Sequence, residues 1–138
     1  MLTQKKDERG KNSQTPKLKI SEIQDLQLKV IGLTNQNALI GKKVEKLLRQ
    51  NSHLWRTVFM PSKELYPLRD MEDGEWSADT LYVFVREGKE SELEQLVKEK
   101  FDADAINWID SNQTLELLGY WKKDSIYNPK MILSVWWN

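Results

Sequence analysis

Two apolar runs, Leu81-Tyr82-Val83-Phe84-Val85 and Met131-Ile132-Leu133-Ser134-Val135-Trp136-Trp137, decide the fold of this chain. In both runs apolar side chains occupy both faces of a strand, because successive side chains point to opposite faces. This pattern is typical of a strand that is covered from above and below. We therefore expect Leu81–Val85 and Met131–Trp137 to form central strands of one sheet.

The clearest helix lies between these two runs. Ser91–Phe101 has an apolar stripe at helical spacing, formed by Leu93, Leu96, Val97 and Phe101. Ser91 and Glu94 also have the spacing of a capping box, in which each side chain satisfies a backbone donor of the first turn.

A short strand and a second helix are expected after it. Ala105–Ile109 predicts the strand. Asp110 or Ser111 is expected to cap a short helix that ends at Gly119, with a hairpin strand over Thr114–Leu118 as the alternative.

The front half is less regular. Residues 1–19 are basic and almost without apolar side chains, which predicts a flexible tail, and residues 20–138 are expected to form a single domain. In Ser21–Leu33 the alternation of Leu26, Leu28 and Val30 predicts a half-exposed strand near a sheet edge.

A helix is expected over Asn35–Asn51, capped by Thr34 or Asn35. Gly41 weakens that helix by about 1 kcal/mol relative to alanine. Leu54–Met60 predicts another strand.

The acidic stretch 61–78 then reads as a loop. A loop of this length is often functional, or else it contains an unrecognised element. The complete pattern predicts an α+β fold or a small α/β sandwich, with a mixed sheet of about five strands and two or three helices.

Composition excludes several classes of protein. The chain has 138 residues and no cysteine, so disulfides, thiolate catalysis and cysteine-bound metals are ruled out. No window approaches the roughly 18 apolar residues that cross a bilayer, and the polar N-terminus is unlike a secretory signal. We expect a cytoplasmic protein that does not associate with membranes.

Catalytic and cofactor motifs fail on spacing. Gly32 and Gly41-Lys42-Lys43 are too far apart for a phosphate loop, and no dinucleotide fingerprint occurs. The single histidine, His53, belongs to no recognisable pattern of nucleophile and base, so it is interpreted as a surface or capping residue. No cofactor or metal site is expected.

Carboxylates do not form a convincing site either. Asp79 precedes the Leu81–Val85 strand and Glu87-Gly88-Lys89 follows it, so the length of the strand separates Asp79 from the tripeptide. The tripeptide is interpreted as a turn, and Asp110 as a helix cap.

Charge is distributed unevenly along the chain. Residues 1–60 contain twelve Lys and Arg against five Asp and Glu, whereas residues 61–138 contain nine against sixteen. The basic helix face could bind an anionic partner such as nucleic acid, together with the tail. That face consists of Lys42, Lys43, Lys46 and Arg49, with Arg56 as a further candidate.

Tryptophan is unusually frequent, with six in the chain. Trp136 and Trp137 are adjacent in a strand and must point to opposite faces, so at least one indole is expected near a surface or interface. Trp121, Trp136 and Trp137 are therefore candidate partner-binding residues.

These observations favour a non-catalytic protein-binding or regulatory module, a subunit of a complex or a self-associating protein. A nucleic-acid-associated protein that uses the tail and the Lys42–Arg49 face is the alternative. A small enzyme with an unidentified site is the third hypothesis.

Overall fold

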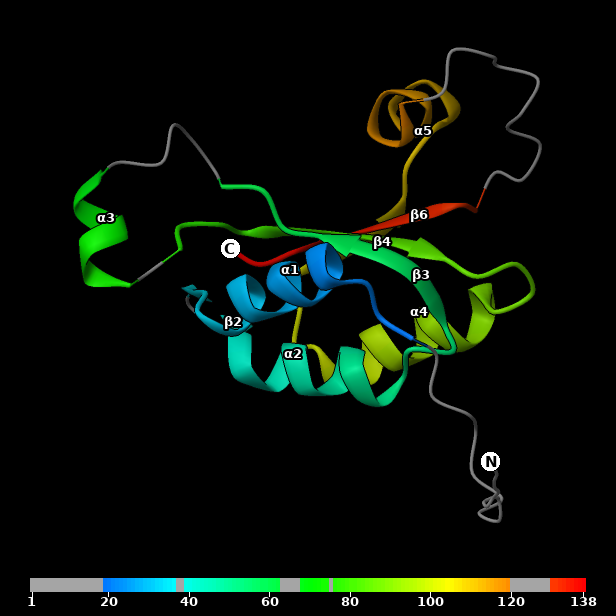
Figure 1. The fold of residues 1–138 in the computed structure, drawn as a ribbon. Helices are drawn as coiled ribbons and strands as arrows, with labels where there is room; N and C mark the ends of the chain where they lie inside the picture. The colour runs from blue at the N-terminus through cyan, green and yellow to red at the C-terminus, as the bar shows by residue number, and fades with distance from the viewer. Residues whose placement is uncertain (1–18, 37–38, 63–67, 75, 120–129) are drawn as a thin grey trace, which may run out of the picture.

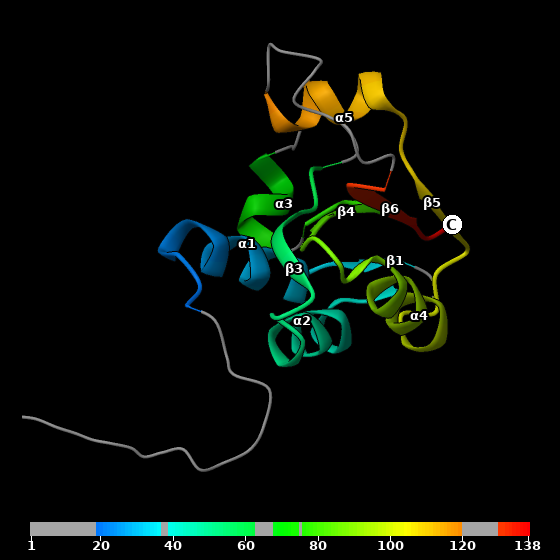
Figure 2. The same cartoon turned by 90° about the vertical axis from the view of Figure 1, so that its right-hand side faces the viewer.

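A four-stranded antiparallel sheet, with α2 and α4 against one of its faces, forms the body of the protein (Figures 1 and 2). The computed structural model describes residues 19–36, 39–62, 68–74, 76–119 and 130–138. The helices are α1 (Glu22–Gly32), α2 (Gly41–Gln50), α3 (Leu68–Asp73), α4 (Glu90–Lys100) and α5 (Ser111–Leu118). The strands are β1 (Asn35–Gln36), β2 (Leu39–Ile40), β3 (Trp55–Phe59), β4 (Thr80–Val85), β5 (Ala105–Trp108) and β6 (Ile132–Trp136). The expected α+β class is confirmed.

The strand order β3-β4-β6-β5 places the two apolar runs in the middle of the sheet, as predicted. On the inner face, which is the face toward α2 and α4, Val83 of β4 lies opposite Val58 of β3 and Leu133 of β6. All three side chains are almost completely buried in the main core. This central position follows from burial, because a strand paired on both sides also presents its side chains to the core.

The expectation of a mixed sheet of about five strands is wrong in detail. All three neighbouring pairs of the main sheet are antiparallel, and β1 and β2 form a separate antiparallel pair. The misleading feature was the apolar character of both faces of β4. Tyr82 and Phe84 on its second face are only half-buried, which is ordinary for an antiparallel sheet with one covered face.

The strand expected over Leu54–Met60 is present as β3, and a bulge interrupts its alternation. The register shifts between Trp55 and Thr57, so Arg56 is an extra residue relative to β4. Arg56 and Thr57 therefore both face solvent, while Trp55 and Val58 both face the core.

The strand expected within Ser21–Leu33 is wrong, because these residues form α1. Ser21 accepts a hydrogen bond from the Gln24 N–H at 3.1 Å and caps the helix. The buried stripe of α1 includes Gln24, Leu28 and Ile31, whereas Leu26 is 58% exposed. Because Gln24 in that stripe is polar, the helical period is hard to recognise in the sequence, and the alternation of Leu26, Leu28 and Val30 is the stronger pattern.

The helix expected over Asn35–Asn51 is present in its second half as α2. Its cap is Ile40, without a side-chain bond, so the predicted cap at Thr34 or Asn35 is wrong. The preceding residues pair as β1 and β2 instead. Gly41 begins α2 beside the C-terminal end of α1, where its N–H donates to the Thr34 carbonyl at 2.9 Å.

The helix expected over Ser91–Phe101 is α4, which begins one residue earlier. Its cap position is Lys89, which makes no side-chain capping bond, so the predicted capping box is wrong. Ser91 lies inside the first turn, and Glu94 bonds Lys98 and Trp108 instead.

The helix after Asp110 is confirmed as α5, and the alternative strand over Thr114–Leu118 is wrong. Asp110 accepts from the Gln113 N–H at 2.9 Å, and Gly119 adopts the left-handed conformation that ends the helix. Leu118 is only partly buried, and Thr114 is the buried residue of this helix.

The stretch 61–78 contains α3, and the described residues form five helices where two or three were expected. Leu68 and Met71 of α3 are exposed apolar residues. The flexible tail predicted for residues 1–19 lies outside the described residues except for Lys19. In the described ranges, every helix is too short or too polar to cross a bilayer.

Candidate protein-binding surface

The second face of the main sheet, here called the outer face, carries an aromatic surface. Cross-strand pairing places its residues in register across four strands. The described members are Arg56, Thr57, Phe59, Thr80, Tyr82, Phe84, Ala105, Asn107, Ile132, Ser134 and Trp136. Figure 1 shows this face turned away from α2 and α4, with α3 and α5 standing near opposite ends of it.

Trp136 is the most prominent side chain of the outer face. It pairs with Thr80 on one side and Ala105 on the other, and both of these side chains are much smaller than an indole. The exposed fraction of Trp136 is 39%, and that of Phe59 on the edge strand β3 is 46%. Tyr82, which is half-buried, pairs with Phe59 directly.

Hydrogen bonding separates Trp136 from the other described tryptophans. Four of them donate the indole N–H to a protein oxygen: Trp55, Trp76, Trp108 and Trp137. Within the described ranges the indole N–H of Trp136 has no protein acceptor. A buried indole usually finds a partner for this group, so among the described tryptophans Trp136 is the one whose N–H is left for a partner outside the described residues.

The opposite orientation predicted for Trp136 and Trp137 is confirmed. Trp137 is fully buried, and its N–H donates to the Phe101 carbonyl at 2.9 Å. Trp137 therefore belongs to the core, which leaves Trp136 as the surface member of the pair. Trp121, the third candidate partner-binding residue, lies outside the described residues.

Arg56 belongs to this outer face and not to the basic helix face. Its guanidinium carbon lies 4.4 Å from the centre of the Phe84 ring, a cation–π contact. The bulge in β3 turns Arg56 outward, away from α2, so Lys42 and Arg56 do not share a surface. Arginine and aromatic residues are both enriched at protein interfaces.

One end of the outer face is covered and the other is not. At the covered end, where β5 leads into α5 and β6 begins, Ile109 and Ile132 are buried. Figure 1 shows α5 above this end of the sheet. At the other end Trp136 and Ala105 are exposed. The exposed aromatic surface is therefore limited to the half of the sheet that contains Trp136 and Phe59.

The basic helix face is partly neutralised within the fold. Arg49 bonds Asp25 at 2.7 Å and Glu45 at 2.9 Å, which ties α2 to α1. The hydrogen bonds from Arg49 and then from Lys29 hold the pKa of Asp25 below its ordinary value. Lys43 bonds Asp102 at 2.8 Å.

Two lysines of that face remain available to solvent. Lys42 is 3.9 Å from Glu45, a loose pair, and Lys46 has no ion-pair partner in the described part of the chain. A hollow of about 460 Å³ between α2 and α4 brings Lys46 together with Lys43 and Lys100. Sequence reasoning missed Lys100, because it belongs to a different helix.

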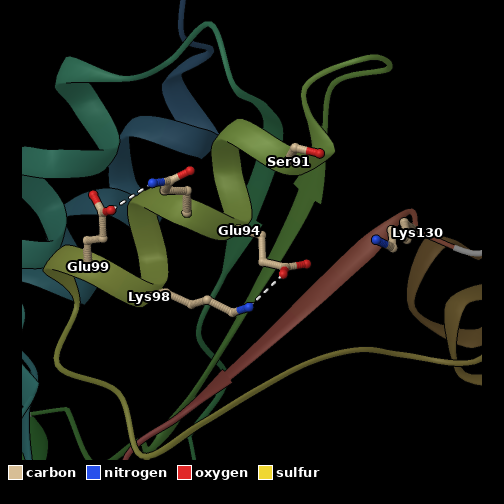
Figure 3. A pocket seen from close by; sticks show the side chains of 6 residues that line it. Ser91, Glu94, Lys98, Glu99 and Lys130 are labelled. Carbon is tan, nitrogen blue, oxygen red and sulfur yellow. Dashed lines mark hydrogen bonds and ion pairs between the residues drawn. The ribbon is translucent and has the colours of Figure 1, made fainter.

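A second hollow, of about 450 Å³, lies between α4 and the chain that enters β6 (Figure 3). Lys98 bonds Glu94 at 2.8 Å across one turn of α4, while Lys130 approaches from the other side. The bond from Lys98, followed by that from Trp108, keeps the pKa of Glu94 below its ordinary value. A carboxylate that is kept ionised in this way is suited to holding α4 and β5 together and not to accepting a proton near neutral pH.

The other sequence candidates for chemistry remain apart. Lys89 bonds Glu92, and Gly88 forms a turn with positive φ, as interpreted from the tripeptide Glu87-Gly88-Lys89. Asp79 lies at the far end of β4. No cluster of three potential metal ligands occurs among the residues that the structure describes.

Comparison with protein-family models found no match, and comparisons with curated proteins and with solved structures found none either. The function is therefore proposed from the chain's own geometry.

Proposed function

We propose that this chain is a non-catalytic protein-binding module, a subunit of a complex, whose partner covers the exposed half of the outer face. The observation that carries the proposal is Trp136, which is 39% exposed on a regular strand and has no acceptor for its indole N–H among the described residues. Tryptophan, tyrosine and arginine are the residues that most often dominate binding energy at protein interfaces.

The surroundings of Trp136 support this assignment. Phe59 and Tyr82 extend the aromatic surface across β3 and β4, next to the position of Trp136. A sheet holds these side chains at fixed positions, so binding them costs little conformational entropy. An exposed aromatic group of this kind is typical of an interaction site.

The test uses affinity capture from an extract of the source cells after nuclease treatment, followed by Kd measurements with the purified partner. Trp136→Ala should weaken binding about 30-fold, the effect of losing an interface residue worth about 2 kcal/mol. Leu26→Ala is the matched control, because Leu26 is also a large exposed apolar residue but lies on α1. Thermal unfolding of both variants verifies that they are folded.

The two variants together show whether the partner binds the outer face or α1. Loss of binding in Trp136→Ala, with normal binding in Leu26→Ala, supports the outer face. The reverse pattern would assign the partner to α1 and reject the proposal.

A nucleic-acid-associated function is the second candidate, and the three lysines of the α2–α4 hollow favour it. Lys43, Lys46 and Lys100 line one surface depression, as a phosphate backbone requires. Binding of a fluorescent single-stranded RNA should then fall steeply with salt, and the triple alanine variant should abolish it. Partners that vanish on nuclease treatment of the extract would favour this function over the first.

A further inference from the structure

The two edges of the main sheet are treated differently. An edge strand presents unpaired N–H and C=O groups that can pair with another chain, and folded proteins usually block them. In this sheet β3 and β5 are the edge strands. Among the described residues, a side chain blocks the edge at β3, whereas none pairs with the edge at β5.

Gln24 of α1 blocks β3. Its side-chain amide donates to the Val58 carbonyl at 2.9 Å and accepts from the Val58 N–H at 3.0 Å. Just after β4, the Arg86 N–H donates to the Leu54 carbonyl. Backbone groups point alternately to the two sides of a strand, so the even-numbered residues of β4 form the hydrogen bonds to β3. Thr57 and Phe59 lie opposite even-numbered residues of β4, whereas Val58 lies opposite Val83. The backbone N–H and C=O of Val58 therefore point away from β4, toward the outside of the sheet. The buried amide of Gln24 therefore occupies the place of a neighbouring strand.

The same alternation identifies the outward groups of β5. The Ile109 N–H donates to the Ile132 carbonyl. Every second residue of the strand bonds the same neighbour, so Asn107 and Ala105 also form hydrogen bonds to β6. The backbone N–H and C=O of Ile106 and Trp108 then point away from β6. No described residue bonds these outward groups, and Figure 2 shows β5 at the margin of the sheet with no element outside it.

The sequence of β5 contains neither of the two residue types that most often discourage pairing at a sheet edge. Edge strands commonly carry lysine or proline, which discourage pairing. Residues 102–110 read Asp-Ala-Asp-Ala-Ile-Asn-Trp-Ile-Asp, with no basic residue and no proline. Asp104 and Asp110 are both exposed, one beyond each end of β5.

Resting on the proposed function, we infer that the partner adds an extended segment to the open edge of β5, beside Trp136. That segment has apolar residues opposite Ile106 and Trp108 and a basic residue at each end. Lysine or arginine there meets Asp104 and Asp110, and opposite charges across strands stabilise pairing. A second copy of this chain fits poorly, because two-fold pairing about Asn107 would place Asp104 of one copy near Asp110 of the other.

The position of β5 makes the two surfaces continuous. Ala105 pairs with Trp136 across β5 and β6, so a strand added to β5 also reaches the outer face. Backbone bonds would supply general affinity, and the side-chain positions would supply specificity.

The first experiment measures amide hydrogen exchange by NMR in the full-length free protein. We expect Ile106 and Trp108 to exchange at least ~10-fold faster than Asn107. Protection of Ile106 and Trp108 at every protein concentration would mean that the edge is already covered, which overturns the inference. Protection that rises with protein concentration would identify a second copy as the occupant and also overturns it.

The second experiment adds the acetylated, amidated peptide Lys-Thr-Val-Thr-Tyr-Thr-Lys at ~1 mM. We expect exchange of Ile106 and Trp108 to slow at least ~10-fold while Asn107 stays unchanged. The peptide with glutamate in place of both lysines is the charge control. The peptide N-methylated at its valine and tyrosine is the hydrogen-bond control. Equal effects of all three peptides, or no effect of any, would overturn the inference.

Variants distinguish this inference from the proposed function. Ile106→Pro removes an outward N–H at an edge position that tolerates proline, and Trp136→Ala leaves the edge intact. If partner binding is lost in Trp136→Ala and retained in Ile106→Pro, the outer face is supported as the binding surface and the inference about the edge of β5 is rejected. If the basic peptide protects the edge but Trp136→Ala leaves partner binding unchanged, the proposed function fails instead.

Discussion

Replacing Gly41 with alanine tests the contact between α1 and α2. A Cβ at this position would lie closer than 3.0 Å to the carbonyl oxygens of Ile31 and Thr34. Both are backbone atoms at the C-terminal end of α1, so no side-chain rotation can relieve the overlap. The Gly41 N–H also donates to the Thr34 carbonyl, and any displacement of α2 disturbs that bond.

The sequence and the structure predict opposite signs for this substitution. Helix propensity alone predicts that alanine stabilises α2 by about 1 kcal/mol. Overpacking against rigid backbone costs about 3 kcal/mol, and weakening the hydrogen bond costs about 1 kcal/mol more. We expect a net loss of about 3 kcal/mol in the free energy of unfolding, or a Tm lowered by about 10 °C in a domain of this size.

Urea denaturation followed by circular dichroism measures this loss. Gly32→Ala is the control, because its Cβ would meet the carboxylate of Glu45 and the ammonium of Lys42, which are ends of flexible side chains. The control should lose under about 1 kcal/mol. A Gly41→Ala variant as stable as the wild type, or more stable, would refute the tight contact between the two helices.

Three further substitutions test other features of the fold. Gln24→Ala should lower stability by about 3 kcal/mol, because it leaves the buried N–H and C=O of Val58 unpaired; a loss under about 1 kcal/mol in urea denaturation would contradict the blocked edge. Asp25, whose pKa Arg49 lowers, stabilises the fold above its ordinary pKa of 3.8, and this stabilisation is lost as the pH falls through the folded pKa. The difference in stability between wild type and Asp25→Asn should therefore shrink from about pH 6 to about pH 2, and a difference that grows toward acid would be contrary. Trp137→Ala should lower stability by about 4 kcal/mol in urea denaturation, because it empties a fully buried site, and an unchanged midpoint would conflict with that burial.

The local patterns of the chain predicted most of the back half correctly. Leu81–Val85 and Met131–Trp137 are central strands, and α5 begins after Asp110 and ends at Gly119. These features depend on side chains a few residues apart, so they are visible in the order of the residues. The helix α4 was also predicted, although its capping box was not correct.

The front half was predicted less well because its key contacts are distant in sequence. Gln24 is polar, and sequence periodicity therefore counted it against a buried helical face. Its burial is stabilised by Val58, which lies 34 residues away. The bulge at Arg56 likewise depends on the register with β4.

The candidate site shows the same division. The opposite directions of Trp136 and Trp137 could be predicted from the sequence, because side chains alternate along any strand. Which of them is exposed depends on the tertiary structure, because α2 and α4 cover the inner face, where Trp137 is buried, while Trp136 on the outer face stays 39% exposed. The tertiary structure likewise shows that Gln24 bonds the edge of β3, while no residue in the described ranges bonds the outward groups of β5. Which strand lies at an edge, and what lies beside it, depends on contacts between distant segments that no local pattern contains.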